Sequence, residues 1–227
     1  MDVGVEVSEG VAEVILDAPP LNLITTRTYD ALADVLGGLR ARDDLHALIL
    51  TGAGPRAFSA GADLREVRAA QASSPAERWG RADDTLGMVR DFPVPTIAAI
   101  NGHALGAGLV LAAMCTMRIA SAKASLGLPE VRHGLSGGVS ALLGAGVHAA
   151  WTDWMVVSGT RVDAPTAMAM GLVQVVVDGD ARDRARQLAA DLCGVPRDAL
   201  VANTALVNEL RESRGRDARA RERRVFQ

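Results

Sequence analysis

The sequence has few aromatic residues and few cysteines. Aromatic side chains make up 3% of the 227 residues, which leaves little stacking surface for a protein that binds single-stranded nucleic acid. Cys115 and Cys193 are far apart, and neither has a second Cys or a His at the spacing of a zinc site. This argues against a disulfide framework, and it predicts that no metal is bound and that both thiols are buried and unreactive.

The sequence also lacks a large excess of either positive or negative charge, and it lacks long hydrophobic runs. The 24 basic and 27 acidic residues give a net charge of −3, which argues against binding nucleic acid through overall charge. No run approaches the roughly 18 apolar residues of a membrane span, and the first residues lack the basic and then apolar profile of a secretory signal. We therefore expect a cytoplasmic protein that binds neither membrane nor nucleic acid.

Hydrophobic residues make up 49% of the chain, enough to bury the core of one large domain or of one domain with an appendage. Their spacing predicts strands alternating with helices, which favours the α/β class. Residues 3–7 and 11–16 alternate as in a β-hairpin, and Thr25 or Thr26 begins a helix. The remaining predictions are buried strands at residues 47–52, 96–100, 117–120 and 124–128, and helices at residues 76–91 and 106–115.

Helices dominate from Val139 onwards, interrupted by an edge strand expected at residues 172–177. The last 30 residues are predicted to be helical. Residues 211–224 contain seven arginines and three acidic residues. A phosphate contact is one interpretation of this excess of positive charge, but we favour a solvated helix end.

Two segments rich in small residues each lead from a strand to the start of a helix, at residues 57–64 (AFSAGADL) and 101–108 (NGHALGAG). Unpaired N–H groups at such helix starts bind negative charge, and two of them together suggest donors that converge on one oxygen. A dinucleotide site is disfavoured because Leu111 stands where the third glycine belongs. Asp63 and Glu66 have the spacing of a capping box, which gives Asp63 a sufficient structural role.

Two further candidates for catalysis follow the second of these segments. Glu130 comes directly after Pro129, in a turn where a carboxylate is either catalytic or simply solvated. Residues 134–138 (GLSGG) fit the nucleophile elbow of serine hydrolases, but the only later histidine is His148, with no acid between it and Ser136. Glycines that precede a helix explain this segment better.

The chain resembles the crotonase superfamily, which contains the enoyl-CoA hydratases and isomerases. The resemblance extends from Met1 to about Gln227, and its most specific motifs occur at residues 57–64, 95–108, 127–130, 158–162 and 169–173. It implies an α/β fold in which a spiral of ββα units is followed by helices that pack subunits into trimers, often paired as hexamers. We accordingly expect a spiral core with trimerisation helices at residues 1–195 and a C-terminal helical segment at residues 196–227 that is shorter than usual.

The resemblance also implies a site for a thioester. The backbone N–H groups of Ala62 and Ala107 become the oxyanion-hole donors, and Glu130 falls on one of two positions where hydratases carry glutamates. The other position is Val110, which can neither orient water nor exchange a proton. The residues expected to bind the substrate are Ala60, Gly61, Asp63, Gly106, Val110, Leu128 and Gly138.

With one carboxylate, the resemblance is closer to the isomerases than to the hydratases. We expect Glu130, beside Val110 and Leu128, to have a raised pKa and to act as the single acid–base group. Three alternatives remain: a hydratase or dehydratase that recruits another group, a decarboxylase, and a catalytically weak accessory subunit. The substrate is an acyl-CoA thioester, or an acyl carrier protein thioester because the C-terminal end is short, and no cofactor is expected beyond the substrate's own coenzyme A or phosphopantetheine.

Overall fold

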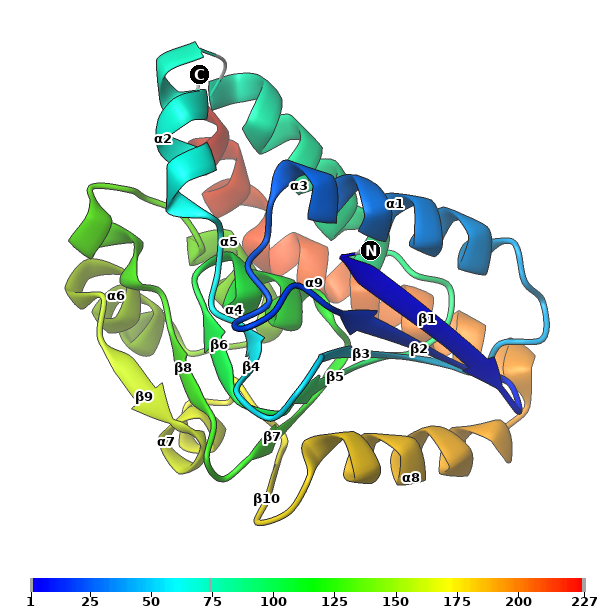
Figure 1. Cartoon of the computed structure of the whole chain (residues 1–227). Helices are drawn as coiled ribbons and strands as arrows, with labels where there is room; N and C mark the ends of the chain where they lie inside the picture. Colours follow the sequence, from blue (N-terminus) through cyan, green and yellow to red (C-terminus); the bar gives the residue numbers. More distant parts are fainter. Residues whose placement is uncertain (1, 74, 226–227) are drawn as a thin grey trace.

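The strands form two sheets, and the chain passes repeatedly from the larger sheet to the smaller one. The computed structural model describes residues 2–73 and 75–225, so Met1 and residues 226–227, at the ends of the predicted match, lie outside it (Figure 1). The larger sheet contains the hairpin β1–β2, which is antiparallel, followed by four strands that add in parallel. In spatial order its strands are β1 (Val3–Ser8), β2 (Val11–Leu16), β3 (Ala47–Gly52), β5 (Thr96–Ile100), β7 (Met117–Ser121) and β10 (Val175–Val177).

The smaller sheet is built from strands of three residues each. Its spatial order is β4 (Ala57–Ser59), β6 (His103–Leu105), β8 (Ser125–Gly127) and β9 (Arg161–Asp163). The first three are parallel, and each follows directly after a strand of the larger sheet. The pairs β3–β4, β5–β6 and β7–β8 therefore form successive turns of a spiral, as the resemblance predicted.

Helices cover both faces of the larger sheet. α8 packs on one face through Ala181, Ala185 and Ala189, and Figure 1 shows it below the sheet, with α1 and α3 above. Thr25 caps α1, as expected, by accepting from the N–H of Thr28 at 3.1 Å. The helices are α1 (Thr26–Arg40), α2 (Leu64–Ser73), α3 (Pro75–Arg90), α4 (Ala107–Met114), η1 (Pro129–His133), α5 (Val139–Ala145), α6 (Ala149–Ser158), α7 (Ala164–Ala169), α8 (Ala181–Cys193) and α9 (Arg197–Val225).

The arginine-rich end of α9 is only in part the solvated helix end that the sequence predicted, because five of its seven arginines are exposed and Arg211 and Arg219 are not. Arg211 is 6% exposed, and its guanidinium donates to the carbonyl oxygens of Cys115, at 2.7 Å, and Ala113. Arg219 is also largely buried and pairs with Asp83 of α3. Positive charge in this helix therefore holds it against its own molecule, a pairing between distant segments that local charge counting cannot reveal.

Within residues 2–73 and 75–225, none of the helices has the length and apolar character needed to cross a bilayer. The same residues contain no group of three or more His, Cys, Asp or Glu side chains arranged to hold a metal ion. Cys115 is buried, and burial raises the pKa of its thiol to about 11, whereas Cys193 is only partly buried.

Candidate functional site

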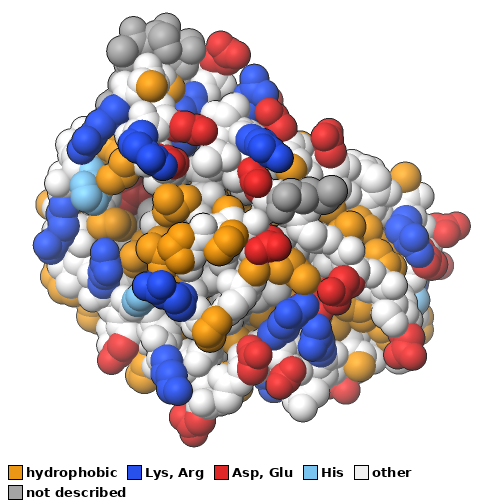
Figure 2. Space-filling model, in the orientation of Figure 1, with side chains coloured by type: hydrophobic (Ala, Val, Ile, Leu, Met, Phe, Trp, Pro, Cys, Tyr) orange, Lys and Arg blue, Asp and Glu red, His pale blue; other side chains and the backbone are white. Residues whose placement is uncertain are grey.

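A cavity of about 600 Å³ lies where the two small-residue segments meet α1, α3, η1 and α9. On the face shown in Figure 2, hydrophobic side chains gather left of centre, with Lys or Arg side chains around them. Nine of the ten residues that the sequence assigned to the site line this cavity: Ala60, Gly61, Ala62, Asp63, Gly106, Ala107, Val110, Glu130 and Gly138. The tenth, Leu128, is 1% exposed and does not line the cavity.

Leu128 supports the cavity wall from behind. A Cβ at Gly138 would lie 2.7 Å from Cδ1 of Leu128, so glycine lets the chain pass directly over this side chain. Gly138 has a φ of +89°, which also favours glycine, and it begins α5. In the structure Leu128 therefore packs behind the cavity wall and does not line the cavity.

The pairing of β4 with β6 brings the two small-residue segments together. Gly61, with φ +104°, approaches the second segment so closely that a Cβ there would lie 2.8 Å from the oxygen of Leu105 and 3.7 Å from the nitrogen of Ala107. A Cβ on Gly108 would lie 2.7 Å from Cβ of Ser59. Side chains at these glycines would hold the segments apart, so their absence sets the spacing between Ala62 and Ala107.

The N–H groups next to Ala62 are already engaged. Gly61 donates to Oγ of Ser59 at 3.1 Å, and Asp63 donates to the carbonyl of Ile24 at 3.0 Å. In the second segment, Gly106 donates to the carbonyl of Gly127 at 2.9 Å. Among the described residues, the N–H groups of Ala62 and of Ala107, the first residue of α4, have no acceptor. Two backbone donors beside the cavity are therefore available to a ligand oxygen.

Glu130 lies over the start of α4. It belongs to η1, which Pro129 begins, and its Oε1 would be 2.8 Å from a Cβ on Gly106, the residue before Ala107. Oε2 of Glu130 is buried and has no hydrogen-bond partner in the described part of the chain. Burial raises the pKa of Glu130 to about 7, as the sequence led us to expect. At neutral pH this carboxyl group can both accept and donate a proton.

Val110, one turn along α4, presents only carbon atoms to the same cavity. The other acidic side chains that line the cavity are held by partners. Asp63 accepts from the backbone N–H and the guanidinium of Arg65, and Glu222 accepts from the N–H of Val139 at 2.8 Å. The third, Asp83, pairs with Arg223 at 2.6 Å.

The capping box predicted for Asp63 and Glu66 is half wrong. Asp63 does accept from the N–H of Arg65, at 2.8 Å, near the start of α2. Glu66 instead reaches the start of α1, where its Oε2 accepts from the backbone N–H of Thr26 at 2.9 Å and from its hydroxyl at 3.2 Å. Glu66 therefore ties α2 to α1, and the backbone N–H of Asp63 that a capping box would use donates instead to the carbonyl of Ile24.

Sequence reasoning missed the part of the cavity wall contributed by helices that are distant in sequence. These residues are Tyr29 of α1, Arg78, Trp79 and Asp83 of α3, and Arg219 and Glu222 of α9. Burial raises the pKa of Tyr29 to about 12, so its phenol stays protonated. No local motif marks these positions, since each is an ordinary residue on a helix and only the fold brings them together.

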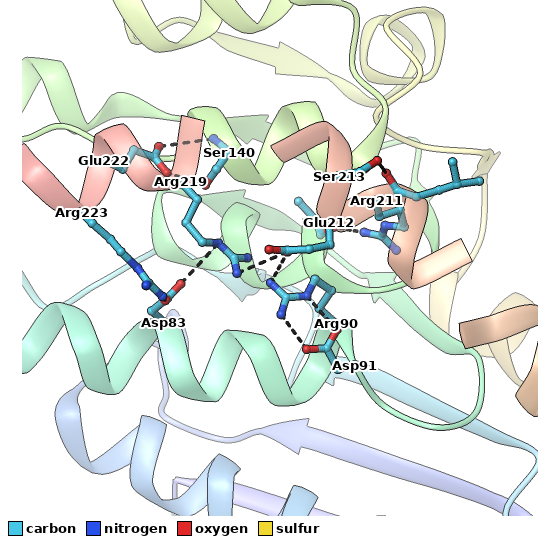
Figure 3. A network of polar contacts seen from close by, with 12 residues as sticks. Asp83, Arg90, Asp91, Ser140, Arg211, Glu212, Ser213, Arg219, Glu222 and Arg223 are labelled. Carbon is cyan, nitrogen blue, oxygen red and sulfur yellow. Dashed lines mark hydrogen bonds and ion pairs between the residues drawn. The ribbon is translucent and has the colours of Figure 1, made fainter. Parts of the chain in front are cut away.

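A network of ion pairs fastens α9 to α3 beside the cavity. Figure 3 shows Asp83 and Arg90 of α3 meeting Arg219 and Glu212 of α9. Arg219 lies 3.6 Å from Asp83 and 3.4 Å from Glu212, and Glu212 lies 2.7 Å from Arg90. In the same view Glu222 reaches Ser140 at the start of α5. The C-terminal helix thus closes one side of the cavity.

The nucleophile elbow suggested by residues 134–138 has no partners in the structure. Ser136 lines the cavity from the loop between η1 and α5. His148 is exposed, caps α6 by accepting from the N–H of Ala150 at 3.3 Å, and does not line the cavity. His133 is exposed and lines the cavity, whereas His103 lies in β6 and does not. The geometry does not support a Ser–His–acid triad.

Comparisons with known proteins find similarity over most of the chain or nearly all of it. The family model described as enoyl-CoA hydratase/isomerase matches residues 6–227. A probable enoyl-CoA hydratase of Mycolicibacterium paratuberculosis is 35% identical over 221 residues, which cover 96% of this chain and 85% of that protein. Carnitinyl-CoA dehydratase of Proteus mirabilis is 39% identical over 187 residues, 79% of this chain and 69% of that protein. The solved structure of Pseudomonas aeruginosa DspI has a TM-score of 0.85 and 36% identity, covering 99% of this chain and 87% of that one.

Proposed function

The chain belongs to the enoyl-CoA hydratase/isomerase family, and from this premise we propose that it moves a double bond between C3 and C2 of an enoyl thioester. Glu130 acts as the single acid–base group, and the N–H groups of Ala62 and Ala107 bind the thioester oxygen. The observation that carries this proposal is the unpartnered Oε2 of Glu130, buried beside two free backbone donors. The proposal starts from the crotonase fold and from the thioester chemistry of the family.

The reaction needs one base and one oxyanion site. In a 3-enoyl thioester the carbonyl acidifies the protons on C2, and removing one gives a dienolate whose charge spreads to the thioester oxygen. Two N–H donors stabilise that charge, and each such donor contributes about 3–4 kcal/mol in known cases. Glu130 takes the C2 proton and returns it at C4. With a pKa of about 7, Glu130 can both accept the proton from C2 and donate it to C4 at neutral pH.

Val110 is the reason to prefer isomerisation to hydration. Adding water to a conjugated double bond uses two carboxylates, which hold the water between them while one supplies a proton. Here Val110 lines the cavity without a polar atom, and Asp63, Asp83 and Glu222 are held by partners. A single titratable carboxylate supports a reaction in which one proton moves and no water is added.

Hydration or dehydration is the second candidate, and the relatives favour it. One is named as a probable enoyl-CoA hydratase and another as carnitinyl-CoA dehydratase. For this chain to catalyse such a reaction, a group other than a second glutamate must orient the water. His133, three residues after Glu130, lines the cavity and is one candidate for this group.

The same proposal covers the group that carries the acyl thioester and the oligomeric state of the protein. The phosphopantetheine arm lies between Ala62 and Ala107 and belongs to coenzyme A or to an acyl carrier protein, and the reaction needs no further cofactor. Assembly as a homotrimer or hexamer follows from the family resemblance, and sedimentation analysis tests it.

The test is to incubate the protein with 3-enoyl-CoA and 2-enoyl-CoA in deuterated water and to identify the products by mass spectrometry. We expect a shifted double bond with deuterium in the acyl chain, lost in Glu130→Gln and kept in Glu209→Gln, an exposed glutamate of α9. A 3-hydroxyacyl product would establish hydration. In a separate incubation with a malonyl-type thioester, loss of carbon dioxide would establish decarboxylation. No turnover of any thioester would favour an accessory subunit.

A further inference from the structure

Among the described residues, Arg78 presents to the cavity a cation with two unpartnered donors. It lies on α3, is half-buried and lines the cavity, and its Nε and Nη2 are buried without a hydrogen-bond partner in the part of the chain that the structure describes. Burying guanidinium donors without an acceptor costs free energy, because their bonds to water are lost and not replaced. These two donors therefore call for an acceptor that enters the cavity from outside.

Every other charged arginine or carboxylate that lines the cavity, apart from Glu130, already has such a partner. Asp63 pairs with Arg65 at 2.9 Å, and Asp83 pairs with Arg219 at 3.6 Å. Glu222 accepts from the N–H of Val139. Among the described residues, Arg78 and Glu130 are thus the two charged groups left to meet a substrate.

The unpartnered atoms of Arg78 are the two that bind a carboxylate as a pair. Nε–H and Nη2–H lie on one edge of the guanidinium and match the two oxygens of a carboxylate. This chain uses that edge repeatedly. Arg42 binds Asp44, Arg65 binds Asp63 and Arg90 binds Asp91, each through Nε to one oxygen and Nη2 to the other.

The part of the cavity between the two backbone donors and Arg78 suits an acyl chain. Ala62 and Ala107 lie at the β4–β6 side and Arg78 on α3, while apolar side chains of α2, α3 and α4 line the space: Val67, Ala82, Leu86, Val110 and Met114. Tyr29 of α1 lines the same cavity.

We propose that Arg78 binds a carboxylate at the far end of the acyl chain, so that the preferred substrates are monothioesters of dicarboxylic acids. This inference rests on the proposed function only in that the cavity holds an acyl thioester. It does not depend on which reaction Glu130 catalyses. Arg78 is in this account a specificity-determining residue.

The test measures binding without turnover. Dissociation constants of glutaryl-pantetheine and pentanoyl-pantetheine, which have equal chain length and no phosphate, are measured by calorimetry for the wild type, Arg78→Gln and Arg78→Lys. The matched control is Arg68→Gln, which removes an exposed arginine of α2 that does not line the cavity. Thermal unfolding of each variant checks that it is folded.

We expect the wild type and the Arg68 variant to bind the glutaryl thioester about tenfold or more tightly than the pentanoyl thioester, a difference of about 1.4 kcal/mol. Arg78→Gln should reduce the preference to about twofold or less, and Arg78→Lys should keep part of it, since lysine keeps the charge but not the paired donors. Equal affinities in the wild type, an unchanged preference in Arg78→Gln, or no binding of either thioester would overturn the proposal. Because saturated thioesters are used, a failure of the isomerase reaction leaves this result unaffected.

Discussion

The chemistry of the site depends on one side chain whose environment changes its acidity. Glu130 lies in a short 3₁₀ helix, and its carboxylate is buried against Gly106 with one oxygen unpartnered among the described residues. Burial raises its pKa to about 7. A carboxyl group near neutrality transfers a proton in either direction, which a solvated glutamate does poorly at pH 7.

The first prediction concerns the pH dependence of isomerisation. Glu130 must be ionised to remove the C2 proton, so kcat/KM for a 3-enoyl thioester should fall about tenfold for each pH unit below its pKa of about 7 and level off above it. Steady-state rates between pH 5 and 9 measure this profile. A profile that is flat, or that rises toward acid, would contradict the role of Glu130 as base.

The second prediction concerns stability. The pKa of Glu130 is higher in the folded protein than its ordinary value of 4.5, so the folded state binds this proton more tightly than the unfolded chain does. The stabilising contribution is complete below pH 4.5 and is lost as the pH rises to about 7. Glu130→Gln should therefore be more stable than the wild type at pH 8, by up to about 3 kcal/mol, with a smaller gain at pH 5.

Urea unfolding of both proteins at pH 5 and pH 8 measures this difference, with Glu209→Gln as the control on an exposed glutamate. Equal gains at the two pH values would mean that burial does not destabilise the ionised form of Glu130.

Among single residues, the sequence predicted those site residues that lie within short motifs. Glu130, Gly61 and Gly106 lie in recognisable segments, so their places beside the cavity could be anticipated. Arg78 and Tyr29 could not, because each lies on an unremarkable helix and reaches the cavity only through the packing of α1 and α3. Leu128 was assigned to the site by its neighbourhood, but its side chain points into the core.

Among the elements, the short strands β4 and β6 matter most, because their pairing sets the distance between the two N–H donors. The longer strands β3 and β5 were predicted closely, since each is a fully buried apolar run. β4, β6 and β9 were not predicted as strands, because they are three residues long and, unlike β8 and β10, do not lie in a longer apolar run. The resemblance to known motifs, and not periodicity, identified the donors.

The third prediction tests this spacing. In Gly108→Ala the new Cβ would lie 2.7 Å from Cβ of Ser59, so β4 and α4 must move apart and misalign Ala62 with Ala107. We expect kcat to fall on the order of 10- to 100-fold and stability to fall by about 1–3 kcal/mol. Enzyme kinetics and thermal unfolding measure the two effects.

Gly38→Ala is the matched control. Gly38 lies inside α1, and a Cβ there would meet nothing within 4 Å. Alanine should raise stability by up to about 1 kcal/mol through its higher helix propensity and leave kcat unchanged. Full activity in Gly108→Ala would show that the close contact of β4 with α4 does not position the donors.

For the whole molecule, the α/β class and the spiral of ββα units were predicted correctly, and the family was confirmed. The course of α9 was not predicted. Its arginines are spaced like those of a solvated helix, yet Arg211 is buried against the carbonyl of Cys115 and Arg219 pairs with Asp83. Such contacts join residues 96 and 136 positions apart and leave no trace in local composition.

The fourth prediction concerns this helix. Deleting residues 216–227 removes Arg219, Glu222 and Arg223, which contact Asp83 of α3 and the start of α5. We expect stability to fall by about 2–4 kcal/mol, because Asp83 and the first N–H groups of α5 lose their partners. Thioester turnover should fall as well, because α9 forms one side of the cavity. Unchanged melting and turnover would show that this last part of α9 is dispensable.

If Glu130 alone carries the proton from C2 to C4, isotope transfer within the substrate reveals it. A 3-enoyl thioester carrying deuterium at C2 is converted in ordinary water, and the product is examined by NMR. We expect part of the deuterium to appear at C4 of the 2-enoyl product, because Oε2 of Glu130 is buried, and we expect Glu130→Gln to give no product. A shifted double bond without deuterium at C4, or wild-type conversion by Glu130→Gln, would contradict this role of Glu130.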